Sequence, residues 1–332
     1  MARLNQKKCQ QGMDGMNLEY VLGLQGAEHL YLPEEVLKNN DGNTVVSISC
    51  VGGKIKAYVN AVHSIRPNNI QPFGIVDTIK LELVKSEVVD FMRGYLKKHL
   101  RHKYSDEYID NIKVMQLECN LTIPCVKGAT PSDVISLFDK ALDKTVLFRK
   151  AKARYKKTNT GCQYSKSKEY RLKIYDKSEE QHAKGNLSVE RNLLRVEVDF
   201  LSRSLNRMYG EKRTLGDILT KQAVVTLCRE YKCVLEEIIN KHIIPFLNEC
   251  VKLLFESMTY SETGKEVCET IARHRDYIPD TEVLRKALQQ YYTDFKKSPD
   301  NSKQMICYYR KKQLGLPEGV LQTIKAFHKS AG

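Results

Sequence analysis

Three segments of the sequence alternate apolar and polar residues, and their polar positions hold three acids and a tyrosine. The segments are residues 112–123, 170–177 and 194–201. Because successive side chains of a strand point to opposite faces, each segment is predicted to bury one face and to offer the other to solvent or to a site. If the three strands are neighbours in one sheet, the acids, the tyrosine and several basic groups converge on a single face.

The alternation assigns every residue of these strands to one of two faces. Residues 112–123 place Glu118 with Gln116, Asn120 and Thr122, opposite Met115, Leu117, Cys119, Leu121 and Ile123. Residues 170–177 place Tyr175 with Arg171, Lys173 and Lys177, opposite Tyr170, Leu172 and Ile174. Residues 194–201 place Glu197 and Asp199 with Arg195, opposite Leu194, Val196, Val198 and Phe200.

A tyrosine in this setting could act as a nucleophile. A phenol with an ordinary pKa of about 10 attacks poorly at neutral pH, so attack on a phosphodiester needs positive charge that favours the phenolate and a cation that neutralises the phosphoryl oxygens. Lys173 or Lys177, together with a divalent ion, could supply both beside Tyr175. Attack would leave a 5′-phosphotyrosyl link and a free 3′-hydroxyl.

The acids of the same face could hold that ion. Mg²⁺ or Mn²⁺ prefers oxygen ligands, for which Glu118 and Glu197 are the first candidates and Asp199 the reserve. The alternative is that an antiparallel sheet simply has a solvated face, on which cross-strand pairs of acids and lysines are ordinary. Alternation alone favours this structural explanation.

The positive charge of the chain is concentrated in one region. The formal net charge is +14, and residues 144–177 hold twelve Lys or Arg against two acids. Such a surface suits the phosphate backbone of a nucleic acid, although the same run could be a solvated helix face or a flexible arm. The residues predicted here to contact DNA are Lys152, Arg154, Lys156, Lys157, Tyr164 and Arg171, with Tyr164 stacking on bases.

The remaining pattern predicts an α+β fold with a largely antiparallel sheet and flanking helices. Strands are expected at 44–51, 54–62, 77–84, 112–123, 169–177 and 192–202, and helices at 85–102 and 131–144. From about residue 211 the pattern changes to amphipathic helices at 216–241, 244–257, 280–297 and 302–313, with a closing helical segment. We therefore expect a catalytic domain over residues 1–209 and an all-α domain over 210–332.

The end of the chain contains a basic aromatic segment, CYYRKKQLGLPEGVLQTIK, with the look of two helices joined by a turn. This arrangement favours DNA binding of the helix-turn-helix kind, and a terminal hairpin that only packs on the sheet domain is equally compatible. The residues predicted to contact DNA are Tyr308, Arg310, Lys311 and Lys312.

Four segments resemble the gene II/X family of filamentous-phage and plasmid replication initiators, which nick one DNA strand to begin rolling-circle replication. They are QPFGIVD at 71–77, MQLECNLTI at 115–123, YSKSKEYRLKIYDKSEEQ at 164–181 and LLRVEVDFLSRSLNRMYG at 193–210. The resemblance covers about residues 70–215. It implies that Tyr175 is the nucleophile, that Lys177 matches a family lysine, and that Glu118 and Glu197 hold the metal.

The start of the chain departs from this family, because its opening strand is not evident in MARLNQKKCQQGMDGMN, and the first sixteen residues are predicted to be disordered. Many other nickases hold the metal with two histidines that flank an apolar residue. No histidines here have that spacing. His63 is predicted to be a hydrogen-bonded strand-end histidine rather than a third ligand, and His182 follows Tyr175 in an expected loop. Tyr155, Tyr164 and Tyr170 are rival nucleophiles.

The sequence therefore favours a metal-dependent nickase that starts replication, with Mg²⁺ or Mn²⁺ as cofactor. Its expected partners are single-stranded or supercoiled origin DNA, a host helicase and a host polymerase, and no membrane. The ten cysteines form no CxxC pair and are predicted to be reduced thiols of a cytoplasmic protein in a bacterial host. The alternatives are a non-catalytic origin-binding protein of the same family and a conjugative relaxase.

Overall fold

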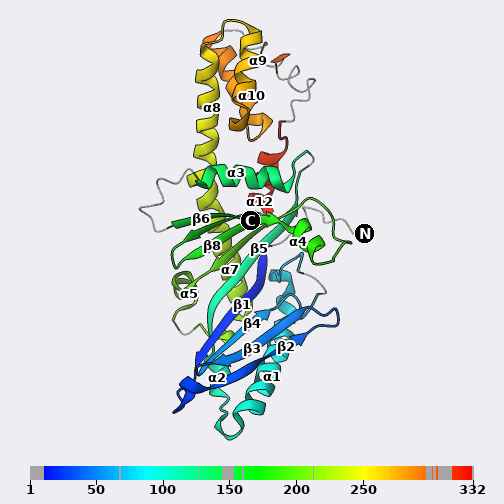
Figure 1. Cartoon of the computed structure of the whole chain (residues 1–332), viewed down its shortest axis with the longest axis vertical. Helices are drawn as coiled ribbons and strands as arrows, with labels where there is room; N and C mark the ends of the chain where they lie inside the picture. Colours follow the sequence, from blue (N-terminus) through cyan, green and yellow to red (C-terminus); the bar gives the residue numbers. More distant parts are fainter. Residues whose placement is uncertain are drawn as a thin grey trace.

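The computed structural model describes residues 11–66, 69–126, 128–143, 161–211, 213–296, 301, 304–305 and 316–330, together with the backbone of 153–158. Its centre is one nine-stranded sheet in the order β2-β3-β4-β1-β5-β9-β8-β7-β6, and every neighbouring pair is antiparallel (Figure 1). The strands are β1 Gly12–Val21, β2 Tyr31–Lys38, β3 Thr44–Val51, β4 Lys54–Asn60, β5 Lys113–Pro124, β6 Ala153–Thr158, β7 Gly161–Lys166, β8 Tyr170–Asp176 and β9 Leu193–Phe200. The predicted α+β class is confirmed.

Helices follow and interrupt the strands. Before β7 they are α1 Leu81–Leu100, α2 Glu107–Asp110 and α3 Pro131–Asp143, and after β8 they are α4 Lys177–Ala183, α5 Ser202–Tyr209, α6 Leu215–Ile218, α7 Lys221–Ile238, α8 Ile244–Thr259, α9 Gly264–Arg273, α10 Thr281–Gln290 and α12 Val320–Ser330. Short helical turns are η2 Ala27–His29, η3 Ile75–Lys80, η4 Arg101–Lys103, η6 Ile239–Ile243, η7 Arg275–Tyr277 and η8 Tyr291–Phe295.

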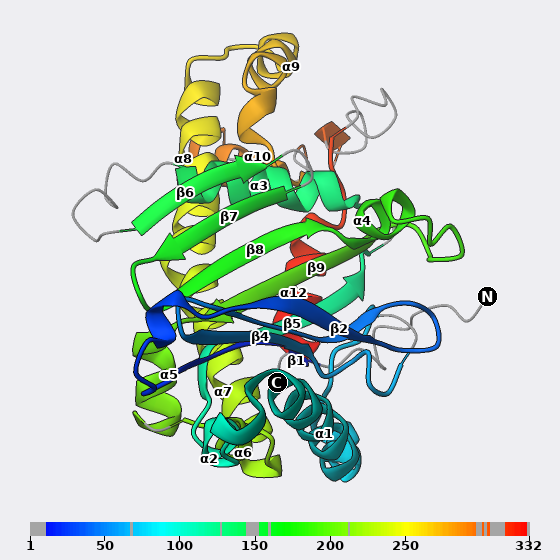
Figure 2. The same ribbon diagram turned by 60° about the horizontal axis from the view of Figure 1, so that its bottom comes forward.

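Helices cover the apolar face of the sheet. α1 packs on β2 and β3, α7 on β1 and β5, and α3 on β7 and β8. Figure 2 shows α3, α8 and α12 behind the strands. The hydroxyl of Tyr231 in α7 donates a 2.8 Å hydrogen bond to the backbone carbonyl of Val196 in β9. The apolar face is thereby fixed, and the polar side chains of the central strands lie on the other face.

The part of the chain after residue 210 contributes both to this packing and to a projecting group of helices. α7 and α12 lie close to the sheet, whereas α8 extends away from it and carries α9 and α10 against its far half (Figure 1). The division into two domains near residue 210 remains a prediction. No helix in the described part of the chain is long and apolar enough to cross a membrane.

Two expectations about the N-terminal half are wrong. Residues 77–84, predicted as a strand, belong to η3 and α1, because the Asp77 carboxylate accepts a 2.9 Å hydrogen bond from the Gly74 amide and caps a helical turn. The predicted disorder also fails for residues 12–16, which are part of β1. β1 lies between β4 and β5, in the middle of the sheet.

The alternation in β5 holds except at its start. Gln116 faces Asn17 of β1, but the next pair along the ladder joins Leu18 to Val114, so one extra residue of β5 is accommodated there. As a result, Val114 is buried and Met115, which was predicted to face the core, is 37% exposed. Beyond this bulge, Leu117 is again buried.

Candidate active site

The strand register brings the three acids of the polar face together. Glu118 of β5 stands opposite Asp199 of β9, and Glu197 of β9 stands opposite Lys173 of β8. One carboxylate oxygen from each of Glu118, Glu197 and Asp199 lies within 4.8 Å of the others. We call these three residues the acid trio. The alternation in the sequence predicted this shared face, whereas the chemical roles of its residues remain predictions.

Tyr175 of β8 reaches the acid trio through its hydroxyl, which donates a 3.0 Å hydrogen bond to Glu197 Oε2. The side chain is half-buried. Burial raises the pKa of the Tyr175 phenol well above its usual value, and the nearby Arg195 guanidinium only partly opposes this effect. The phenol is therefore protonated at neutral pH, and a proton acceptor already lies in hydrogen-bonding contact with it.

Lys173 lies between two members of the acid trio. Its Nζ is 2.6 Å from Glu197 Oε1 and 3.1 Å from Asp199 Oδ1. Burial disfavours the ammonium, but the charges of Glu197 and Asp199 outweigh it and raise the Lys173 pKa. Burial also disfavours the Glu197 carboxylate, but the charge of Lys173 outweighs the effect of burial and lowers the Glu197 pKa. Lys173 thus neutralises part of the trio's charge.

Asp199 bears on whether the acid trio could hold a metal ion. Its side chain is fully buried, and its Oδ2 lies 3.0 Å from Arg171 Nε and 3.0 Å from Lys173 Nζ. Despite these ionic contacts, no donor among the described residues is aligned with Oδ2 for a hydrogen bond. An all-oxygen set of this kind is what a hard divalent ion such as Mg²⁺ or Mn²⁺ requires, and such an ion would compete with Lys173 for Asp199 Oδ2.

Glu118 completes the acid trio in a crowded position. Burial, and then the charges of Glu197 and Asp199, raise the Glu118 pKa to about 8. A side chain at Gly15 of β1 would meet it, since a Cβ there would lie 2.8 Å from Glu118 Oε2 and 2.5 Å from the Tyr58 hydroxyl. Gly15 therefore allows Glu118 and Tyr58 to approach the same point beside β1.

Lys177 is near Tyr175 but not on the strand face where the alternation placed it. β8 ends at Asp176, and the Asp176 side chain accepts a 3.0 Å hydrogen bond from the Glu179 amide and so begins α4 at Lys177. The segment expected as a loop is therefore partly helical. Lys177 is only 1% exposed, and its Nζ is 6.0 Å from the centre of the Tyr175 ring.

The charge of Lys177 depends on its buried surroundings. Its Nζ lies 2.5 Å from Glu180 Oε2 and 3.0 Å from Asn69 Oδ1. Burial, followed by repulsion from Arg195, lowers the Lys177 pKa to about 8, although the Glu180 carboxylate opposes the shift. Burial also disfavours the Glu180 carboxylate, but Lys177 outweighs this effect and lowers the Glu180 pKa to about 2. Lys177 is thus still mostly charged at neutral pH.

A buried ion pair below the site was missed at the level of sequence. Arg195 is fully buried; its Nη1 lies 3.1 Å from Asp14 Oδ2 and its Nε donates to Thr122 Oγ1 at 2.8 Å. Asp14 of β1 also accepts from Asn120 at 2.9 Å. The alternation placed Arg195 on the polar face, but the Asp14 partner lay in a segment predicted to be disordered.

The predicted DNA contacts have different outcomes. Arg171 is half-exposed and donates to Gln116 Oε1 at 2.9 Å, beside the acid trio. Tyr164, predicted to stack on bases, is instead 4% exposed in the core, because β7 turns it to the apolar face opposite Leu172. Three other predicted contacts lie in β6, where only the backbone is described: Arg154, Lys156 and Lys157. The remaining ones lie outside the described residues: Lys152, Tyr308, Arg310, Lys311 and Lys312.

The rival residues whose side chains are described do not share the geometry of Tyr175. Tyr170 is 3% exposed on the apolar face, as predicted. The side chain of Tyr155 lies outside the described part of β6. The ring of His63 is 2.8 Å from the Thr44 carbonyl, and that of His182 is 3.0 Å from the Val189 carbonyl. His63 is thus hydrogen-bonded, as predicted, and both histidines are bound to backbone.

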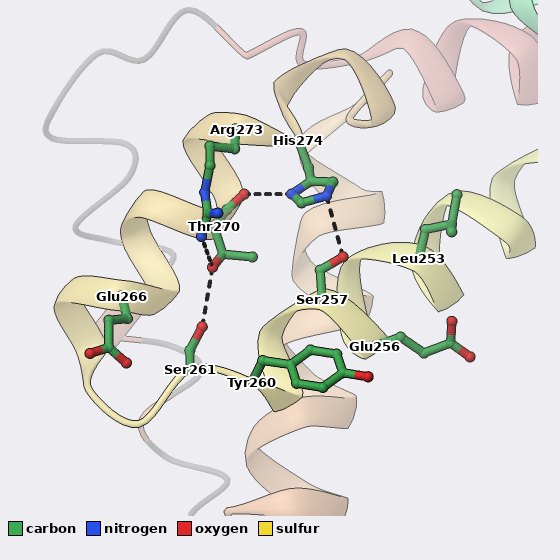
Figure 3. Close-up of a pocket in the computed structure, with 9 residues that line it drawn as sticks. All are labelled: Leu253, Glu256, Ser257, Tyr260, Ser261, Glu266, Thr270, Arg273 and His274. Atoms are coloured by element: carbon green, nitrogen blue, oxygen red, sulfur yellow. Dashed lines mark hydrogen bonds between the residues drawn. The ribbon is translucent and has the colours of Figure 1, made fainter.

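A cleft of about 490 Å³ lies elsewhere, between α8 and α9 (Figure 3). Its polar groups largely bond one another: Thr270 contacts the Ser261 hydroxyl at 3.1 Å and accepts from Arg273 at 3.1 Å, while the His274 ring contacts Ser257 at 3.4 Å. Acidic and basic groups are mixed along its walls. The acid trio with Tyr175 is therefore the stronger candidate for a reaction centre.

Comparisons with known proteins give little beyond this geometry. No protein-family model matches the chain, and no curated protein matches its sequence. Among solved structures it is similar to a rolling circle replication initiator protein from Geobacillus stearothermophilus, with 10% sequence identity and a TM-score of 0.28. The likeness covers 60% of this chain and 77% of that chain. A TM-score this low establishes no relationship.

Proposed function

We propose that the chain is a metal-dependent DNA nickase that cuts one strand through Tyr175 and starts rolling-circle replication. The observation that carries the proposal is the 3.0 Å hydrogen bond from the Tyr175 hydroxyl to Glu197, since Glu197 also belongs to the acid trio. A nucleophile, its proton acceptor and a set of metal ligands therefore share one carboxylate. This combination is what transesterification of a phosphodiester requires.

The proposed reaction exchanges one ester for another. The Tyr175 oxygen attacks phosphorus, its proton passes to Glu197 Oε2, and the bond between phosphorus and the 3′-oxygen breaks. The 3′-oxygen takes a proton from water and leaves as a hydroxyl, Glu197 gives its proton to the hydroxide that remains, and the 5′-phosphate stays on Tyr175. Rejoining is the reverse reaction. A divalent ion held by Glu118, Glu197 and Asp199 would neutralise charge on the phosphoryl oxygens.

The lysines supply positive charge at two points. Lys173 lies between Glu197 and Asp199, and its ammonium would add positive charge beside the metal ligands. Lys177 lies beside the Tyr175 ring, where an ammonium stabilises a developing phenolate. Both charges act in a partly buried site, so each is screened less than it would be at the surface.

The proposed substrate is single-stranded or supercoiled origin DNA, for which the basic region at residues 144–177 provides electrostatic attraction. The cofactor would be Mg²⁺ or Mn²⁺. In the cytoplasm of a bacterial host, a helicase would unwind the duplex and a polymerase would extend the free 3′-end. A conjugative relaxase would use the same chemistry on a different DNA element.

Incubation with single-stranded origin DNA and Mn²⁺, followed by a denaturing gel, tests the reaction. The intact protein should give a slowly migrating adduct that requires the metal and disappears in Tyr175→Phe. Tyr170→Phe is the matched control, because it removes a hydroxyl from the other face of the same strand. Salt-dependent DNA binding without any adduct would overturn the catalytic proposal and favour an origin-binding protein.

A further inference from the structure

The backbone of residues 69–72 runs beside the site without forming a strand or a helix, and arginines hold its carbonyls. Two side chains take all four of these acceptors: Arg195 donates to the carbonyls of Asn69 and Ile70, the latter at 3.0 Å, and Arg66 donates to those of Gln71 at 3.2 Å and Pro72 at 2.8 Å. Arg195 is fully buried. Hydrogen bonds to charged groups are stronger than ordinary ones, so this segment has a fixed path.

The following residues are fixed as well. Phe73 pairs through its backbone with Met13 of β1, at 2.9 and 2.7 Å. A Cβ on Gly12 would lie 2.2 Å from the Phe73 carbonyl oxygen, so only glycine lets the two backbones cross there. Arg66 Nη2 lies 2.6 Å from Asp77 Oδ1 and forms an ion pair with it. We call residues 69–77 the strap. It contains the QPFGIVD segment, which has no role in the proposed nicking step as described above.

The strap brings one side chain, Asn69, between the buried ion pair and Lys177. Its Nδ2 donates to Asp14 Oδ2 at 3.2 Å, and its Oδ1 accepts from Lys177 Nζ at 3.0 Å. The only other oxygen bonded to this ammonium among the described residues belongs to Glu180, in α4. Without the Asn69 oxygen, Glu180 alone would direct the ammonium.

We propose that Asn69 is a positioning residue that holds the Lys177 ammonium beside Tyr175. The inference rests on the proposed function, because it gives the strap a role in the nicking step. Asp14 fixes the amide end of Asn69, Arg195 fixes its backbone, and the remaining oxygen then has one orientation. That oxygen, together with Glu180, keeps the Lys177 ammonium 6.0 Å from the centre of the Tyr175 ring.

A double-mutant cycle on the rate of adduct formation tests this role. Asn69→Ala should slow a single turnover at least about tenfold while the Kd for origin DNA stays within about twofold. Lys177→Met should show the same pattern, and the double variant should be no slower than Lys177→Met alone. Ile79→Ala, an 88% exposed change next to the strap, is the matched control and should leave the rate unchanged.

The two possible failures are distinguishable. If the two rate effects multiply, or if Asn69→Ala weakens DNA binding as much as it slows turnover, then Asn69 does not act through Lys177 and the inference is overturned. Melting temperatures of the unaltered protein, the two single variants and the double variant test the contact between Asn69 and Lys177 without DNA. Asn69→Ala should lower the melting temperature less in the Lys177→Met background than in the unaltered protein. An equal cost in both backgrounds overturns the inference, whereas coupled melting with no adduct in the intact protein overturns the proposed function instead.

Discussion

Replacement of Lys173 by methionine is expected to tighten metal binding. The Lys173 ammonium contacts Glu197 at 2.6 Å and Asp199 at 3.0 Å, so it already neutralises two of the three carboxylates that a divalent ion would use. Methionine keeps much of the length and apolar stem of lysine but removes the charge. The acid trio then becomes more negative, and its attraction for a cation increases.

Coulomb's law gives the approximate size of this effect. Two unit charges about 4 Å apart interact by about 4 kcal/mol at an effective dielectric constant of about 20. The Lys173 side chain is 30% exposed, so water screens part of its charge. We therefore expect about half of this energy, roughly 2 kcal/mol, which corresponds to a Kd for Mn²⁺ lower by a factor of about 30.

Titration of the DNA-free protein with Mn²⁺, followed by electron paramagnetic resonance or calorimetry, measures this change. Lys56→Met is the matched control, because Lys56 is exposed on β4 of the same sheet and touches none of the three acids. The control should bind Mn²⁺ like the unaltered protein. Binding by Lys173→Met that is unchanged or weaker would refute the idea that this lysine and a metal compete for the acid trio.

Three further changes have expected outcomes. Gly15→Ala forces a Cβ against Glu118 and should weaken Mn²⁺ binding at least about tenfold in the same titration. Glu180→Gln removes the carboxylate that pairs with the Lys177 ammonium, whose pKa of about 8 lies below the usual 10.5. The melting temperature of this variant should fall by several degrees at pH 7 and by less at pH 9.5, where the amine is neutral. Tyr170→Phe removes a buried hydroxyl that has no hydrogen-bond partner among the described residues, so its melting temperature should be unchanged or higher.

The alternation of residue types was enough to predict the shared face of the site. Tyr175, Glu197 and Asp199 lie on strands that pair without a bulge, and Glu118 lies beyond the bulge of β5, so a period of two fixes the direction of each side chain. Antiparallel neighbours then place those faces in one surface. The order of the strands was not predictable from the pattern, but the conclusion required only that β5, β9 and β8 be adjacent.

Other parts of the site depend on interactions that the pattern does not contain. Met115 is exposed because a bulge shifts the register of β5, and Lys177 leaves the strand face because the Asp176 side chain begins a helix. Asp14 and Asn69 reach Arg195 and Lys177 from more than a hundred positions away in the sequence. Such contacts are set by tertiary packing, so periodicity and composition give no sign of them.

The central claim concerns which oxygen bonds to DNA, and mass spectrometry of the trypsin-digested adduct measures it most directly. Cleavage after Lys173 and Lys177 releases residues 174–177, in which Tyr175 is the only tyrosine. The account predicts that this peptide carries the 5′-phosphate of the nicked strand. A nucleotide attached to any other tyrosine, or to no residue after a metal-dependent nick, would contradict it.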